Sequence, residues 1–262
     1  MRPSSLVRYL PLFAFGLAIA ASASADKTNI LGTRTKVTNG MVHFGDILRK
    51  IIPLKSVSLP APLRYASGNN CTFDMFWKRP GAAELNGEMK INTAPVRDRI
   101  AISITGFETQ SSLLISPTGT ITNFNTMDPF SRQRVTAKSL PAFAEKTKAL
   151  MRKLYPDATN EDMLLGYPML PRLVDNDGSV GAKVAVLDSL NGEWAAYYYQ
   201  GMTTYEGYSG ALLDLVRVMN INGKPTNVRV GFLVAETHTM MPLVFVFENY
   251  DQMHGKVTRC DR

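Results

Sequence analysis

Apolar and polar side chains alternate along several stretches in the first half of the chain, and this alternation predicts β-strands. In residues 71–78 the odd-numbered positions share one face. Residues 99–107 alternate in the same way, with isoleucine at positions 100, 102 and 104. Residues 111–124 have the pattern of two strands joined by a turn at 117–119, where proline and glycine favour chain reversal.

The second half of the chain predicts more strands, arranged as hairpins. Residues 182–200 contain two strand-like runs around Asn191-Gly192, and residues 212–235 repeat the arrangement around Asn222-Gly223. Asn-Gly between alternating runs is the strongest short signal for a two-residue hairpin turn. A further strand is predicted over 241–250. The total is about ten strands joined mostly by short turns, which favours antiparallel pairing.

One long amphipathic helix is predicted over 139–156, where Ser139 is placed to cap the start and Pro156 to end the helix. Its apolar stripe and its basic outer face are formed respectively by Phe143, Leu150, Met151 and Leu154, and by Lys146, Lys148, Arg152 and Lys153. Such a helix either packs its stripe on a sheet or lies on a membrane surface, and packing is the commoner arrangement. Helical spacing also occurs over 41–53.

These elements predict a β-rich α+β fold. A large antiparallel meander would curl into a half-barrel, barrel or sandwich, with the long amphipathic helix packed on it and covering one opening. No Gly/Ser-rich or Pro-rich linker separates the two β-rich halves. Residues 26–262 are therefore predicted to form a single domain.

The N-terminal residues have the features of a secretory signal peptide. Arg2 and Arg8 are followed by an apolar run over 9–21 and by a small-x-small pattern that ends at Ala25. The apolar run is shorter than the roughly 20 residues that a membrane-spanning helix needs. Residues 1–25 are therefore predicted to be cleaved, which indicates a periplasmic or secreted protein.

The chain has two cysteines, Cys71 and Cys260. Oxidising compartments allow disulfides to persist, and an even number of cysteines without zinc-like spacing favours a bridge over a metal site. A Cys71–Cys260 disulfide is therefore predicted, and two free thiols are the alternative. The bridge would fasten a C-terminal tail, 255–262, whose low apolar content otherwise predicts fraying.

Composition describes a folded globule, with 45% hydrophobic and 19% charged residues and a formal net charge of +7. Lys and Arg are scattered along the chain and form no basic run, so nucleic-acid binding is not predicted. A modest positive charge is compatible with the anionic polymers and lipids of a cell envelope. Membrane contact is expected to be peripheral at most.

No pattern predicts a metal site or a cofactor. The three histidines, His43, His238 and His254, are isolated from one another in the sequence. Residues 174–181 resemble a calcium loop at first, but Gly178 follows Asp177 directly, which breaks the required spacing and indicates a hairpin turn. Glycine-rich nucleotide-binding motifs are also absent from the sequence.

Residues 207–215, GYSGALLDL, are similar to the nucleophile segment of chymotrypsin-like proteases, which would make Ser209 a nucleophile. Tyr208 and Ala211 replace the aspartate and second glycine of that segment. The upstream histidine, His43, lacks the setting of a catalytic base. A Gly/Tyr-rich loop is the simpler interpretation, so no catalytic residue is assigned.

Aromatic and methionine side chains on the predicted strands could instead line an apolar pocket inside a curved sheet. The candidate lining residues are Met75, Trp77, Trp194, Tyr198 and Phe245. A packed core is the alternative role for the same side chains. The leading hypothesis is an exported, non-enzymatic envelope protein that binds a lipid-like ligand or an envelope protein partner. A secreted serine hydrolase using Ser209 and a purely structural scaffold are the alternatives.

Overall fold

The computed structural model of the protein describes residues 52–79, 81–154, 170–189, 192–221, 223–237, 239–248 and 252–261. The predicted signal peptide, 1–25, lies outside the described residues. So does the helix predicted over 41–53, except for its last two positions, which begin strand β1 (Ile52–Lys55).

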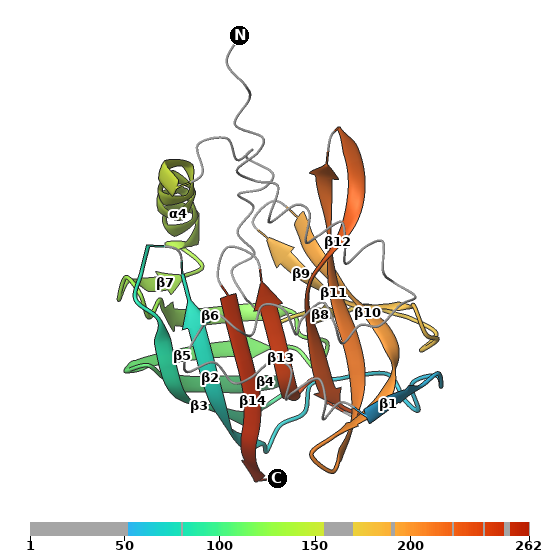
Figure 1. The fold of residues 1–262 in the computed structure, drawn as a ribbon. Helices are drawn as coiled ribbons and strands as arrows, with labels where there is room; N and C mark the ends of the chain where they lie inside the picture. Colours follow the sequence, from blue (N-terminus) through green and yellow to red (C-terminus); the bar gives the residue numbers. More distant parts are fainter. Residues whose placement is uncertain are drawn as a thin grey trace.

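The described residues form one antiparallel sheet of 14 strands, which is seen in Figure 1. Thirteen strands follow the path β7-β6-β5-β4-β3-β2-β14-β13-β12-β11-β10-β9-β8, and β1 pairs with β10 beside this path. Their bounds are β2 Asn70–Lys78, β3 Leu85–Val96, β4 Arg99–Gly106, β5 Thr109–Ile115, β6 Ile121–Met127, β7 Arg134–Thr136, β8 Arg172–Leu173, β9 Lys183–Ser189, β10 Gly192–Tyr205, β11 Tyr208–Ile221, β12 Lys224–Glu236, β13 Pro242–Glu248 and β14 Gln252–Asp261. Strands β7 and β8, at the two ends of the path, do not pair with each other, so the curled sheet formed by the described strands is an unclosed half-barrel. The predicted fold class is confirmed.

Both predicted hairpins are present, although Gly192, expected in the first turn, is the first residue of β10. Ser189 pairs with Gly192 between β9 and β10, and Ile221 pairs with Lys224 between β11 and β12. A third long hairpin, β10–β11, turns at 206–207, where both residues have positive φ. Glu-Gly is a weaker turn signal than Asn-Gly. The sequence pattern therefore missed this turn.

The C-terminal tail, expected to fray unless a disulfide fastens it, is also held by strand pairing. Strand β14 lies inside the sheet, with β13 on one side and β2 on the other (Figure 1). The meander thus returns at its end to its first long strand. The tail is held because both of its edges make ladder hydrogen bonds, which a local apolar count cannot reveal.

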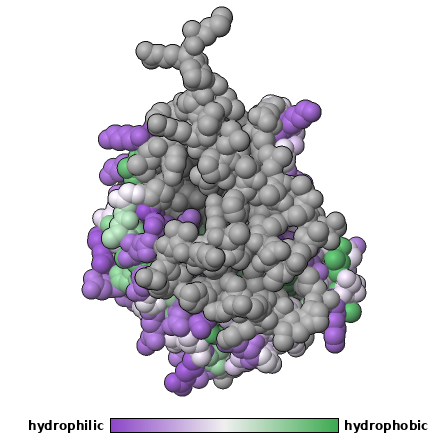
Figure 2. All heavy atoms as spheres, in the orientation of Figure 1, coloured by the Kyte–Doolittle hydropathy of each residue, from purple (hydrophilic) through white to green (hydrophobic). Residues whose placement is uncertain are grey.

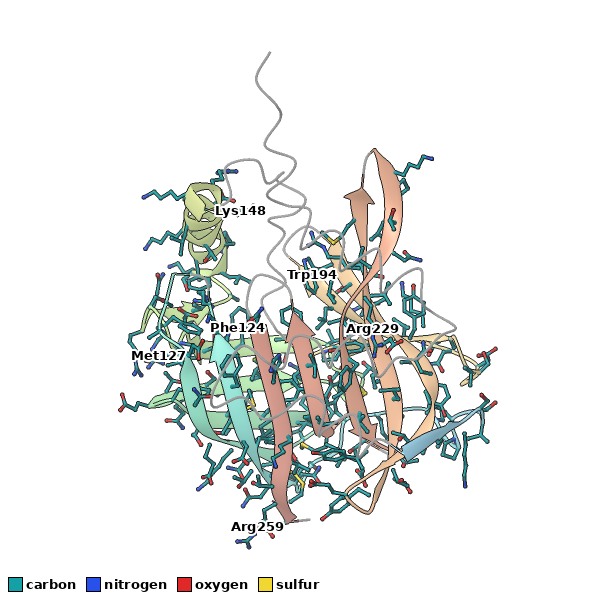
Figure 3. The ribbon with its side chains drawn as sticks, viewed as in Figure 1. Phe124, Met127, Lys148, Trp194, Arg229 and Arg259 are labelled. Atoms are coloured by element: carbon teal, nitrogen blue, oxygen red, sulfur yellow. A yellow bond between two sulfur atoms is a disulfide. The ribbon has the colours of Figure 1, made fainter. Side chains whose placement is uncertain are left out.

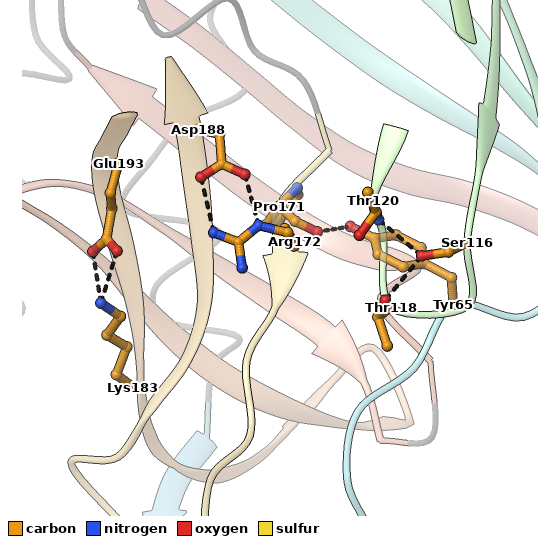
Figure 4. A network of polar contacts seen from close by, with 9 residues as sticks. All are labelled: Tyr65, Ser116, Thr118, Thr120, Pro171, Arg172, Lys183, Asp188 and Glu193. Atoms are coloured by element: carbon orange, nitrogen blue, oxygen red, sulfur yellow. Dashed lines mark hydrogen bonds and ion pairs between the residues drawn. The ribbon is translucent and has the colours of Figure 1, made fainter. Parts of the chain in front are cut away.

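Contacts of loop residues connect the β5–β6 side of the sheet to the β8 side (Figure 4). The Tyr65 hydroxyl donates to the Pro171 carbonyl at 2.6 Å, and the Tyr65 amide donates to the Pro117 carbonyl at 3.0 Å. The Leu173 amide in β8 donates to the Thr118 carbonyl at 2.8 Å. The β5–β6 turn is thereby attached to β8, although β8 is not a neighbour of β5 or β6 in the sheet.

Helix α4 (Leu140–Leu154) follows β7 and confirms the predicted helix. The Ser139 carbonyl accepts the first helical hydrogen bond from the Phe143 amide at 3.0 Å. The Ser139 hydroxyl does not cap a helical N–H group as predicted, but accepts from the Thr136 amide at 2.9 Å. The predicted stripe is wrong at Leu150, which is 42% exposed. The side chains of Met151 and Leu154 lie outside the described part of the structure. Within that part, no helix is long and apolar enough to cross a membrane.

Candidate ligand-binding cavity

A cavity of about 380 Å³ lies between the concave face of the sheet and helix α4. Strands from β2 to β6 form one wall, and β10, β12, β13 and β14 form the opposite wall. Because alternate side chains of a strand point to the same face, most of these strands contribute residues that are two positions apart. The apolar residues among them are chiefly Met89, Ile91, Ile104, Leu113 and Phe124 on one wall and Leu233, Phe245, Phe247 and Met253 on the other.

Helix α4 supplies the third wall. Leu140, Phe143, Ala144 and Thr147 line the cavity at the i, i+3, i+4 and i+7 spacing of one helical face. The sequence pattern had placed Phe143 correctly but extended the stripe toward Leu150. The stripe instead continues through the small residue Ala144 and through Thr147, whose hydroxyl donates to the Phe143 carbonyl at 3.0 Å. Backbone bonding of this hydroxyl lets Thr147 occupy an apolar face.

A buried ion pair joins two cavity-lining residues, Arg79 and Asp128. The Arg79 Nη1 atom lies 2.7 and 2.9 Å from the two Asp128 carboxylate oxygens. Asp128 is 1% exposed and also accepts hydrogen bonds from the Ser131 amide and hydroxyl, at 2.9 and 2.6 Å. The charge of this carboxylate is therefore well compensated.

Aromatic rings cover the same ion pair. The Arg79 guanidinium lies 4.5 Å from the centre of the Phe130 ring, and Trp77 meets Phe130 edge to face at 5.4 Å. The ion pair and the rings connect the end of β2 to the loop that precedes β7 and α4. This rim of the cavity is thus held by contacts between residues about 50 positions apart.

Several other polar groups of the lining are also bonded within the protein. Arg172 donates to both carboxylate oxygens of Asp188, at 2.8 and 3.0 Å, as Figure 4 shows. The hydrogen bond with Asp188 raises the pKa of Arg172 further above its usual range. The Thr109 hydroxyl donates to the Gly106 carbonyl at 2.8 Å. The cavity therefore offers a ligand mostly apolar surface.

Two tyrosines near the sheet edge by β8 stay neutral. Burial raises the pKa of Tyr197, which lines the cavity, and also raises the pKa of Tyr65. The Tyr65 pKa is raised further by the proximity of Tyr197. Neither hydroxyl ionises near neutral pH, and the neutral Tyr65 hydroxyl is the donor to the Pro171 carbonyl.

Of the five predicted lining residues, Trp77 and Phe245 lie in the cavity wall. Met75 is instead buried in the main core at 3% exposure. Its side chain packs over Gly255 of β14, where a Cβ atom would come within 2.5 Å of the Met75 sulfur and of the Phe245 ring. Met75 and Phe245 therefore both pack against this glycine, but only Phe245 lines the cavity.

Trp194 and Tyr198 also lie outside the cavity lining. Trp194 is buried in a second apolar cluster, 5.5 Å from the Phe247 ring and beneath the Arg217 guanidinium. Tyr198 pairs across the sheet with Asp214, whereas its neighbour Tyr197 lines the cavity. The register of β10 shifts on both edges near 197–201, which simple alternation cannot anticipate.

Ser209 lies exposed near the start of β11, opposite Thr204. His43 and His238 lie outside the described residues. His254 is 1% exposed on β14 and stacks on Phe76 at 5.4 Å, several strands away from Ser209. The described part of the structure therefore brings no histidine to Ser209.

The described residues also contain no group of three or more His, Cys, Asp or Glu side chains that could hold a metal ion. The calcium-like stretch 174–181 connects β8 to β9 as a hairpin. The Asp177 carboxylate accepts hydrogen bonds from the hydroxyl and amide of Ser179, at 2.7 and 2.9 Å, and these bonds lower the pKa of Asp177. The carboxylate thus stabilises a turn, as the sequence predicted.

No family model matches the chain, and no curated protein matches it. Among solved structures, the chain is similar to a LolA superfamily protein, NE2245 from Nitrosomonas europaea, with 13% sequence identity and a TM-score of 0.28. The match covers 82% of this chain and 91% of the other. Function is therefore inferred from the cavity.

Proposed function

We propose that the protein is an exported, non-enzymatic carrier that binds the acyl chain, or a comparable apolar part, of a lipid-like ligand. The cavity of about 380 Å³ between the sheet and α4 is the observation that carries this proposal. Its size falls in the range of roughly 300–1,000 Å³ that is usual for small-molecule sites. A scaffold would gain packing contacts by filling this space, so the cavity favours ligand binding over a purely structural role.

The chemistry of the lining supports an apolar ligand. Asp128, Asp188, Thr109 and Thr147 already have partners within the protein. A ligand group placed against them would gain few new hydrogen bonds. Burial of methylene groups contributes about 0.8 kcal/mol each, so a buried chain of eight to ten would supply roughly 6–8 kcal/mol before the costs of association.

Export and the disulfide belong to the same proposal. The Cα atoms of Cys71 and Cys260 lie 4.1 Å apart, which supports a bridge formed in an oxidising compartment. The single-domain organisation of residues 26–262 also remains a proposal, supported by one sheet that contains all described strands. We place the mature protein in the periplasm or outside the cell.

Native mass spectrometry of the purified protein tests the function directly. The expected result is a co-purified lipid that organic extraction removes, after which a dansyl-labelled fatty acid binds with enhanced fluorescence. Failure of both the natural lipid and the labelled fatty acid to bind would reject the carrier and favour a role in binding an envelope protein.

A further inference from the structure

The positive charge of the chain is concentrated around helix α4. Residues 129–154 contain seven Lys and Arg residues but one acidic residue, Glu145, which gives this segment a net charge of +6 out of +7 for the chain. The basic residues are Arg132, Arg134, Lys138, Lys146, Lys148, Arg152 and Lys153. Their spacing conceals this concentration in the sequence, because no two are adjacent except the last pair. The other 236 residues are nearly neutral in sum.

The fold places these charges on the outer side of the cavity wall. The inner face of α4 carries Phe143 and Thr147 against the cavity, whereas Lys146, Arg152 and Lys153 are exposed on the outside. In Figure 2, hydrophilic side chains cover the outer side of α4 at the upper left of the molecule. Figure 3 shows Lys148 on this helix, at the opposite end of the molecule from Arg259.

Acidic side chains lie beside two of these basic residues, Arg132 and Lys148. Arg132 pairs with Glu108 at 2.9 Å, and Lys148 pairs with Glu145 at 2.7 Å. The exposed lysines at 138, 146 and 153 extend the positive surface from the loop before α4 to its last turn. An exposed apolar side chain, Leu150, lies among them with 42% of its surface accessible.

We propose that the outer face of α4 docks the protein on an anionic lipid surface. Phospholipid headgroups provide the complementary negative charge, and an exposed leucine among basic residues is typical of helices that lie in the membrane interface. Docking would bring a wall of the cavity next to the bilayer from which a lipid-like ligand enters. The transfer role rests on the proposed function, but the membrane contact is independent of it.

Vesicle flotation tests the proposal with the purified protein. Vesicles of phosphatidylcholine with about 30% phosphatidylglycerol should bind the protein at low salt, more weakly at high salt, and pure phosphatidylcholine should not. In Lys146→Gln/Lys153→Gln, the partition coefficient should fall about 25-fold, because each basic residue near an anionic surface contributes about fivefold. The matched control is Lys55→Gln/Arg259→Gln, which removes the same charge at the end of β1 (Figure 1) and at Arg259 (Figure 3), both far from α4, and should bind as the wild type does.

Three results would overturn the proposal: equal binding to neutral vesicles, equal weakening by both double variants, or no binding to anionic vesicles at low salt. The last result would point to an acidic protein partner for this face. Binding of the labelled fatty acid is measured in the same samples. Vesicle binding without fatty-acid binding would reject the carrier function alone, and the reverse would reject membrane docking alone.

Discussion

Cys71 and Cys260 face each other on β2 and β14, with 4.1 Å between their Cα atoms and 189 residues between them in sequence. The pair lies where the last strand of the sheet meets its first long strand. Their separation is well within the roughly 7 Å that a disulfide requires. A bridge at this point would enclose nearly the whole described fold in one loop.

Cys71→Ser and Cys260→Ser are expected to lower the free energy of unfolding equally, by up to about 5 kcal/mol, because the bridge restricts the unfolded chain over a long loop. Urea unfolding of the oxidised protein measures this loss. The double variant should be no less stable than either single variant, and reduction of the wild type should reproduce the effect. Labelling of two free thiols in protein taken from its native compartment would contradict the bridge.

Ile104→Trp is expected to abolish binding of the labelled fatty acid, because residue 104 lines the cavity and the indole would occupy its volume. Overpacking of this kind costs about 1–3 kcal/mol, so circular dichroism and thermal unfolding should still report a folded protein. Ser103→Trp is the matched control, since its side chain lies on the opposite face of β4. Unchanged fatty-acid affinity in Ile104→Trp would place the ligand elsewhere.

Arg79→Met is expected to destabilise the protein by about 3–5 kcal/mol, because it leaves the buried Asp128 carboxylate without its ionic partner. The double variant Arg79→Met/Asp128→Leu should recover part of this loss, since neither charge then remains buried. Arg259→Met removes a solvent-exposed partner of Asp261 and should cost less than about 1 kcal/mol. Equal losses at positions 79 and 259 would show that the rim pair is not structurally important.

The stability of the protein at alkaline pH should depend on Tyr197, which is half-buried in the cavity wall. Burial raises its pKa above the ordinary value of 10.0, so the folded state keeps the phenol protonated where the unfolded state releases the proton. Its contribution is complete below pH 10 and is lost as the pH rises further. Between pH 9 and 11, Tyr197→Phe should lose about 1.4 kcal/mol less stability than the wild type, measured by urea unfolding. An identical pH dependence in both proteins would mean that Tyr197 is solvated.

Ser209→Ala is expected to leave fatty-acid binding and thermal stability unchanged, because Ser209 is exposed and outside the cavity lining. Titration with the labelled fatty acid and thermal unfolding measure both properties. If the protein hydrolysed an ester substrate and this variant lost that activity while remaining folded, the serine hydrolase alternative would replace the carrier.

Local chemistry in the sequence determined most of the secondary structure. Two hairpins form where Asn-Gly occurs in the sequence, near 191–192 and 222–223, and the alternation of isoleucines from 100 to 104 assigned one face of β4 to the interior. These signals depend on neighbours within a few residues, so they can be recognised without a structure. The antiparallel fold class and the helix followed from them.

Only the tertiary structure decided which side chains form the cavity. Near the register shifts at 197–201, Tyr197 lines the cavity and Tyr198 does not. Met75 is buried in the core against Gly255. Asp128 forms an ion pair with Arg79, 49 residues away in the sequence, and β14 pairs with β2, which lies near the other end of the described chain. Such choices arise from long-range pairing and packing, which no short window of sequence contains. The same packing turned scattered lysines and arginines into one basic face on α4.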